Sequence, residues 1–162
     1  MLIRFAALLV VLPALLVTGC SEGFLPLGGC TELGCASSFS IEFQRQSAWK
    51  PGAYSVKATV DGKPFTCSAT IPLSCNAPDP CPADAPFLLG LSGCAQDPSQ
   101  HSLSGIEVLQ GSAPASIDIE IAQDGSVIGT GTFKPTYTTS RPNGPGCEPI
   151  CESAPSAKLT LP

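Results

Sequence analysis

The chain has 162 residues, of which only 13% are charged, and it contains 17 prolines and 16 glycines. This composition leaves almost no periodic stretch long enough for a sustained helix, so we expect short strands joined by many turns. The formal net charge is −5 and the few lysines and arginines do not cluster, which excludes recognition of a nucleic-acid backbone and electrostatic adhesion to anionic lipid.

Residues 1–19 are predicted to be an export signal rather than part of the fold. Residues 1–4 carry the amino terminus and Arg4, and residues 5–17 are almost wholly apolar. Because about 20 apolar residues are needed to span a bilayer, this run is too short for a comfortable transmembrane helix. It has the size of the apolar region of a secretory signal peptide.

The apolar run ends in the sequence Val17-Thr18-Gly19-Cys20, which places small residues before a cysteine. This motif resembles the lipobox of bacterial lipoproteins, and the resemblance covers only the first 20 residues. It implies cleavage before Cys20, a thioether-linked diacylglycerol on its sulfur and, in many Gram-negative bacteria, a further N-acyl chain. Several acyl chains give stable anchoring where one would be marginal. Ser21 follows instead of aspartate, which by resemblance to enterobacterial sorting implies the outer membrane of the cell envelope.

Two other interpretations of this terminus are an ordinary signal peptide with a coincidental cysteine and an uncleaved N-terminal anchor. The cysteine count favours the lipoprotein, because assigning one of the nine cysteines, Cys20, to lipid leaves an even number. The eight that remain are Cys30, Cys35, Cys67, Cys75, Cys81, Cys94, Cys147 and Cys151. Outside the cytoplasm thiols oxidise, so up to four disulfides are expected.

The pairing of these cysteines is not set by the sequence, since eight cysteines allow on the order of 100 connectivities. Proximity along the chain favours Cys30 with Cys35 and Cys147 with Cys151. Metal binding is the rival use of the thiols, but their spacings are unlike a zinc knuckle and His101 is the only histidine. We predict disulfides, no metal and no cofactor.

The mature chain is predicted to consist of a tether and one domain. Residues 20–37 are rich in glycine and small side chains, which is typical of a flexible, lipid-anchored tether, and the cysteines in it can tie down its end. Residues 38–162 carry the alternating apolar pattern of strands and are assigned to a single β domain.

The clearest predicted element is a β-hairpin. Apolar and polar residues alternate over 54–60 and 65–71, on either side of Asp61-Gly62. A two-residue type I′ turn at this dipeptide pairs Val56 with Cys67, and the apolar residues of both strands then share one face. Cys67 is therefore expected on the buried face.

Further strands are predicted at residues 39–43, 87–91, 103–108, 117–121, 127–137 and 157–161. A short helix over residues 44–49 is a less favoured alternative. The rest of the segment 72–100 shows no regular pattern and holds three cysteines, so we expect a loop that disulfides fix to the domain.

The strand at 117–121 carries alternating isoleucines and precedes Asp124-Gly125. A two-residue turn would put Phe133 on the wrong face, so we predict a three-residue loop, 123–125, with Gly125 at positive φ. That loop places Val127, Gly129, Gly131 and Phe133 on the isoleucine face. The two glycines then leave space for a bulky neighbour such as Trp49.

Seven or eight short strands in about 125 residues are best accommodated by two antiparallel sheets packed face to face. The predicted fold is an all-β, disulfide-stapled β-sandwich. The strand pattern resembles immunoglobulin-like and transthyretin-like sandwiches, although no tyrosine stands two residues before a cysteine as in a tyrosine corner. The segment 136–151 is similar to the ends of Cys-rich lipoproteins of predatory or soil bacteria, a resemblance that implies no activity.

No constellation of residues in the sequence predicts catalysis. His101 stands in a polar segment where we predict a solvated loop side chain, and no serine lies in a Gly-x-Ser-x-Gly motif. Asp118 and Glu120 share a face, which is typical of a solvated sheet surface. Three aspartates of the long loop lack calcium-loop spacing, so calcium binding by them is a minor alternative: Asp79, Asp84 and Asp97.

The sequence therefore predicts a lipid-anchored protein of the cell envelope with a non-catalytic binding or structural domain. Its expected contacts are the membrane, through the lipid on Cys20, and a protein or envelope polymer that the sequence does not identify. One alternative is an inhibitor or decoy of an envelope or secreted enzyme, because the proline-rich loop 141–149 is rigid and a preorganised loop loses little entropy on binding. Another is a hydrolase with a site near His101.

Overall fold

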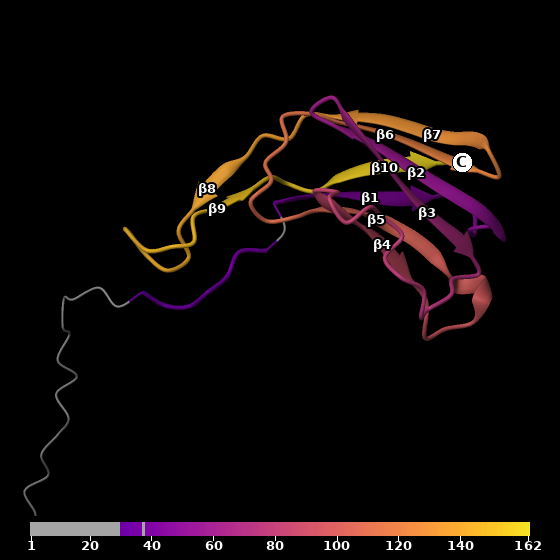
Figure 1. Cartoon of the computed structure of the whole chain (residues 1–162), viewed down its shortest axis with the longest axis horizontal. Coiled ribbons are helices and arrows are strands. Elements are labelled where there is room, and N and C mark those ends of the chain that lie inside the picture. The colour runs from indigo at the N-terminus through magenta and orange to yellow at the C-terminus, as the bar shows by residue number, and fades with distance from the viewer. Residues whose placement is uncertain (1–29, 37) are drawn as a thin grey trace, which may run out of the picture.

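The computed structural model describes residues 30–36 and 38–162, and these form an all-β structure (Figure 1). The strands are β1 Phe39–Arg45, β2 Gly52–Val60, β3 Lys63–Ile71, β4 Phe87–Ser92, β5 Ser102–Val108, β6 Ile117–Gln123, β7 Ser126–Phe133, β8 Thr138–Ser140, β9 Cys151–Ser153 and β10 Ala157–Leu161. One 3-10 turn, Pro98–Gln100, precedes β5. Within the described ranges there is no helix of the length and apolar character that a membrane crossing requires. The predicted export signal and lipobox lie outside the described residues.

Eight of these strands form two four-stranded sheets, which confirms the predicted disulfide-stapled β-sandwich. The first sheet has the order β10-β1-β5-β4 and the second the order β3-β2-β6-β7. Neighbouring strands are antiparallel except β1 and β10, which run parallel. Alternation decides what each layer buries: in β1, Phe39, Ile41 and Phe43 point into the core while Glu42 is exposed. Burial of these apolar faces holds the two layers together.

The predicted hairpin of β2 and β3 is confirmed. Asp61 and Gly62 have φ of 46° and 84°, the positive values that a type I′ turn requires. Val56 pairs with Cys67, and Cys67 is fully buried, as the register predicts. The Asp61 carboxylate also accepts a hydrogen bond of 2.9 Å from the N–H of Ser116, so the turn is fixed to the segment that leads into β6.

The connection between β6 and β7 differs from the predicted three-residue loop. Gly125 has the predicted positive φ, 81°, but Asp124 has a φ of 48° as well, and Gln123 pairs directly with Ser126. The turn is therefore a two-residue hairpin, and a register shift just after Ile121 restores the apolar face. Asp124 favours this tight turn because its carboxylate accepts a hydrogen bond from the start of β2 at 2.9 Å.

The glycines of β7 receive the last strand of the sandwich. Gly129 and Gly131 oppose the β6 isoleucines, as predicted, whereas Val127 lies before the register shift and is 56% exposed. The expected neighbour, Trp49, is wrong: a side chain on Gly129 would collide with Leu161 of β10, and one on Gly131 would be in tight contact with Leu159. β10 therefore packs on β7 and closes this side of the sandwich.

The opposite side of the sandwich, between the edge strands β3 and β4, is closed by covalent bonds. The segment 72–86 crosses it without forming a strand. The disulfide Cys67–Cys81 joins this segment to β3, and Cys75–Cys94 joins it to the loop after β4. These two bonds supply the fixation that the sequence predicts for this loop.

Strands β8 and β9, which the sequence did not predict, form a small two-stranded sheet beyond one end of the sandwich (Figure 1). Residues 30–36 are joined to the segment around it by the disulfides Cys30–Cys147 and Cys35–Cys151. We call residues 30–36 and 138–153 the neck.

The predicted pairing of neighbouring cysteines in the neck is wrong. The segment from Cys30 to Cys35 contains no turn or bend, and five residues of extended chain span about 16 Å. A disulfide needs α-carbons within about 7 Å, so these two cysteines bond across to the facing segment instead. Each of the two bonds joins residues more than 100 positions apart, and in the chain-entropy model the first of them to close stabilises by about 5 kcal/mol.

Replacing Gly129 by alanine is expected to destabilise the domain by about 1–3 kcal/mol, because the added methyl group meets the fully buried Leu161. Urea unfolding, followed by the fluorescence of the single tryptophan, measures the change as a lower midpoint. Gly34→Ala is the matched control, since nothing lies within 4 Å of its added methyl group. Equal midpoints for the two variants would contradict the packing of β10 on β7.

Candidate functional site

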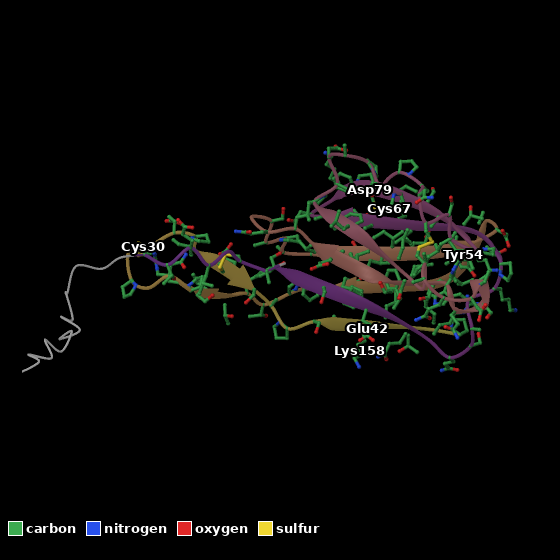
Figure 2. All side chains as sticks on the ribbon, turned by 90° about the horizontal axis from the view of Figure 1, so that it is seen from below. Cys30, Glu42, Tyr54, Cys67, Asp79 and Lys158 are labelled. Atoms are coloured by element: carbon green, nitrogen blue, oxygen red, sulfur yellow. A yellow bond between two sulfur atoms is a disulfide. The ribbon has the colours of Figure 1, made fainter. Side chains whose placement is uncertain are left out.

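The two ends of the molecule differ in what they carry. The neck and Cys30 lie at one end, and Tyr54 lies toward the other (Figure 2). This second end, which we call the distal end, carries the loops 46–51 and 93–101 and the turn at 124–125. A surface at the distal end is therefore far from the point at which residues 1–29 join the described structure.

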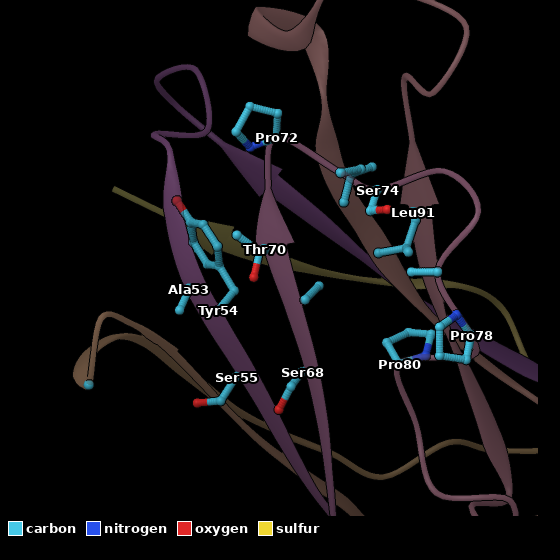
Figure 3. A pocket seen from close by; sticks show the side chains of 14 residues that line it. Ala53, Tyr54, Ser55, Ser68, Thr70, Pro72, Ser74, Pro78, Pro80 and Leu91 are labelled. Atoms are coloured by element: carbon cyan, nitrogen blue, oxygen red, sulfur yellow. The ribbon is translucent and has the colours of Figure 1, made fainter.

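A groove of about 530 Å³ opens at the distal end along the edge strand β3 (Figure 3). We call it the distal groove, and its lining includes Ser68, Thr70, Pro72, Pro78, Pro80 and Leu91. β2 and β3 form one wall, and the segment after β3 and the edge strand β4 form the other. None of its 14 lining residues is charged, although the protein carries a net charge of −5.

Two contacts hold the segment after β3 against that strand, and a third stiffens the segment itself. Cys81 is bonded to Cys67, the Ser68 N–H donates to the carbonyl oxygen of Pro80 at 2.9 Å, and the Asp79 carboxylate accepts from the Cys81 N–H at 2.9 Å. The prolines of this segment further restrict its backbone. This wall of the distal groove is therefore preformed.

Tyr54 anchors the opposite wall. It is 2% exposed, and its hydroxyl donates to the carbonyl oxygen of Lys50 at 2.8 Å and accepts from the Arg45 guanidinium at 3.2 Å. The Trp49 ring packs edge-on against the Tyr54 ring, with 5.2 Å between centroids, and Arg45 lies over Trp49. The tyrosine hydroxyl thus has partners within the protein, and the distal groove presents carbon and small hydroxyl groups.

His101 is buried, so the prediction of a solvated loop side chain is wrong. It is 6% exposed, and its Nδ1 accepts a hydrogen bond of 2.8 Å from the N–H of Leu73, a residue that lines the distal groove. The histidine ties the loop before β5 to the loop after β3, since a buried main-chain N–H needs a partner. Its Nε2 is also buried and has no hydrogen-bond partner among the described residues.

No catalytic arrangement surrounds this histidine in the described part of the chain. The bond with Leu73 is the one hydrogen bond that its imidazole makes there, and neither a serine hydroxyl nor a carboxylate reaches it. Asp118 accepts from the Thr132 hydroxyl at 2.7 Å on the outer face of the sheet, as a solvated surface residue does. The residues that line the distal groove offer a ligand hydrogen bonds and apolar contacts.

Two of the three carboxylates of the long loop, Asp79 and Asp84, take part in local structure, whereas among the described residues the structure shows no side-chain hydrogen bond of Asp97. Lys63 donates a hydrogen bond of 3.0 Å to Asp84 and so holds the pKa of that exposed carboxyl below its ordinary value. Over residues 30–36 and 38–162, no cluster of three or more His, Cys, Asp or Glu side chains is placed to hold a metal ion.

Asn143 organises the neck, where the structure also places the predicted rigid loop 141–149. It is 7% exposed, and its carboxamide oxygen accepts from the Leu33 N–H at 2.8 Å and from the Thr31 hydroxyl at 2.5 Å. Its amide nitrogen donates to the carbonyl oxygens of Leu33 and Glu148. The side chain thereby replaces a strand pairing between two segments that are also joined by disulfides.

Comparison with known proteins gave no relative to guide the assignment. No family model matches the chain, and no curated protein or solved structure matches it significantly. The distal groove has no sequence motif either, because its lining comes from separate segments of β2, β3, the following loop, β4 and the turn at Gly125. Sequence reasoning missed it for that reason.

Replacing His101 by alanine is expected to lower the free energy of unfolding by about 1–3 kcal/mol, because the buried Leu73 N–H loses its acceptor. His101→Asn, whose carboxamide oxygen can take the place of Nδ1, should retain more of that stability. Guanidinium unfolding of both variants measures the difference. If the two variants lost the same stability, the hydrogen bond would not be what the histidine contributes.

Replacing Asn143 by aspartate is expected to loosen the neck, because an oxygen then faces the carbonyl oxygens of Leu33 and Glu148. Amide hydrogen exchange of Leu33, followed by NMR, should become faster by about tenfold or more. The exposed Asn76, for which the structure shows no side-chain hydrogen bond, gives the matched control Asn76→Asp. Unchanged exchange at Leu33 would argue against the role of Asn143.

Proposed function

We propose that the protein is a bacterial lipoprotein of the cell envelope, cut before Cys20 and held on the outer membrane by acyl chains on that residue. Its β-sandwich is a non-catalytic binding module for a protein or an envelope polymer. The sequence Val17-Thr18-Gly19-Cys20 at the end of a short apolar run supports the anchor. The distal groove supports the binding function.

The proposal rests on how the nine cysteines are used. All eight cysteines after residue 20 are paired in four disulfides. The ninth, Cys20, stands where a lipobox puts the lipidated residue, and it lies outside the described residues. Four disulfides are typical of a domain that folds outside the cytoplasm, so the pairing and the export signal agree on one compartment.

The geometry of the neck supports a particular orientation on the membrane. Cys30 lies ten positions after Cys20, and a chain of that length spans at most about 35 Å. A lipid on Cys20 would therefore keep the neck close to the bilayer and turn the distal groove away from it. This orientation favours the distal groove, rather than the loop 141–149 in the neck, as the surface that meets a partner.

Replacing Cys20 by serine tests the anchor. The native protein should partition with membranes, and mass spectrometry of its first peptide should show Cys20 as the N-terminus with acyl chains attached. The variant should leave the membrane fraction or keep residues 1–19, because it has no thiol for the thioether. Cys30→Ser with Cys147→Ser, which removes one neck disulfide and leaves the lipobox intact, is the matched control. A native N-terminus at Met1 with an unmodified Cys20 would refute the anchor.

A further inference from the structure

We propose that the distal groove binds an extended, uncharged peptide segment of a partner protein, which pairs with the main chain of Thr70 on the edge of β3. This inference names the partner class for the proposed binding module and rests on that binding function. It does not depend on the lipid at Cys20, so the two can fail separately.

The main-chain groups on the edge of β3 point away from the sheet at every second residue. Val60 and Lys63 flank the two-residue turn and form a hydrogen-bonded pair, so every second residue from Lys63 onward bonds to β2. The residues between them, Thr66, Ser68 and Thr70 among them, turn their N–H and C=O groups away from the sheet. β3 has no neighbouring strand on that side.

The neighbouring outward positions along the groove offer no free N–H. Pro72 has no N–H, and the N–H of Ser68 already donates to Pro80. Among the described residues, the N–H of Thr70 has no main-chain or side-chain acceptor, and Thr70 lines the distal groove. An added strand exchanges its main-chain hydrogen bonds with such a group.

The walls of the distal groove are uncharged and partly apolar. Leu91, 38% exposed on β4, and Pro78 face the groove from the side opposite Thr70 (Figure 3). A charged side chain would lose water there without gaining a partner, because the lining holds no charge. Hydroxyls on Ser68 and Ser74 at the rim can bond to peptide groups. The lining therefore favours an uncharged segment with apolar side chains.

The segment that forms one wall of the distal groove has to move little when a peptide binds. The disulfides Cys67–Cys81 and Cys75–Cys94 fix the segment that forms one wall, and His101 holds the N–H of Leu73 within it. A preformed wall spends little conformational entropy on binding.

The experiment uses the full-length protein, purified in detergent, and a phage-displayed library of random heptapeptides. Enriched sequences should lack charged residues and alternate apolar with small polar residues, because only every second side chain of an extended peptide faces the groove. The most enriched sequence is then synthesised with blocked ends, and its affinity is measured by calorimetry. In the NMR spectrum of the labelled protein, the amide of Thr70 should shift when this peptide is added.

Two matched pairs of variants locate the peptide. Thr70→Pro removes the N–H inside the groove, and Thr66→Pro removes an outward N–H of the same strand outside the groove lining. Leu91→Glu puts a charge in the groove, and Val127→Glu puts one on an exposed residue of β7. The first member of each pair should weaken binding about tenfold or more, and the second should leave it unchanged. Melting curves check that each variant folds, and either pair alone decides the question.

Several results would overturn the proposal. These are a library without enrichment, enriched peptides that are charged, and affinities that Thr70→Pro and Leu91→Glu leave at the level of their controls. Light scattering that shows a dimer which Leu91→Glu dissociates would make a second copy of this chain the occupant instead. Absent peptide binding with Cys20 acylated would remove this inference and leave the anchor, whereas peptide binding by a protein without lipid would remove the anchor alone.

Discussion

The disulfide between Cys67 and Cys81 joins the buried face of an edge strand to a segment that has no secondary structure. On the side of β7 and β10, leucines fill the space above two glycines and close the sandwich by apolar contact. On the side of β3 and β4 no strand is available, and the segment that crosses the gap buries few side chains. Phe65 and Phe87 pack edge to face across this side, and where the segment itself has few side chains to bury, covalent bonds hold it in place of apolar contacts. The wall of the distal groove is a consequence of that replacement.

The neck shows the same substitution at one end of the molecule. Strands β8 and β9 have three residues each, too short to form a stable sheet alone, so two disulfides and the carboxamide of Asn143 hold residues 30–36 against them. Once one of these disulfides has closed, the second closes only a short loop and adds little entropy. Its effect is directional, because two bonds fix the course of the chain where a single bond would act as a pivot. The neck, where the described structure begins at Cys30, and the distal groove are thereby kept at opposite ends.

Local patterns in the sequence predict the local structure well. The Asp61-Gly62 hairpin, its register and the burial of Cys67 follow from alternation and turn chemistry alone. The β6–β7 connection shows the limit: both a three-residue loop and a tight turn followed by a register shift bring Gly129 to the isoleucine face, and the hydrogen bond that Asp124 makes to β2 selects the second. Cysteine pairing, the burial of His101 and the distal groove depend on contacts between distant segments, for which one sequence carries no local signal.

An edge strand is a hazard in any sandwich, because its unpaired main-chain groups can recruit other chains. On β3 this hazard is reduced by Pro64 at an outward position, by Pro72 directly after the strand and by the hydrogen bond from Ser68 to Pro80. If the edge of β3 were fully protected, the N–H of Thr70 would have an acceptor as well. Among the described residues its N–H is instead left without a partner, in the wall of a groove whose lining is uncharged, so the groove would favour a chain with neutral side chains. The arrangement that prevents unspecific pairing along β3 is therefore the one that would make pairing at Thr70 selective.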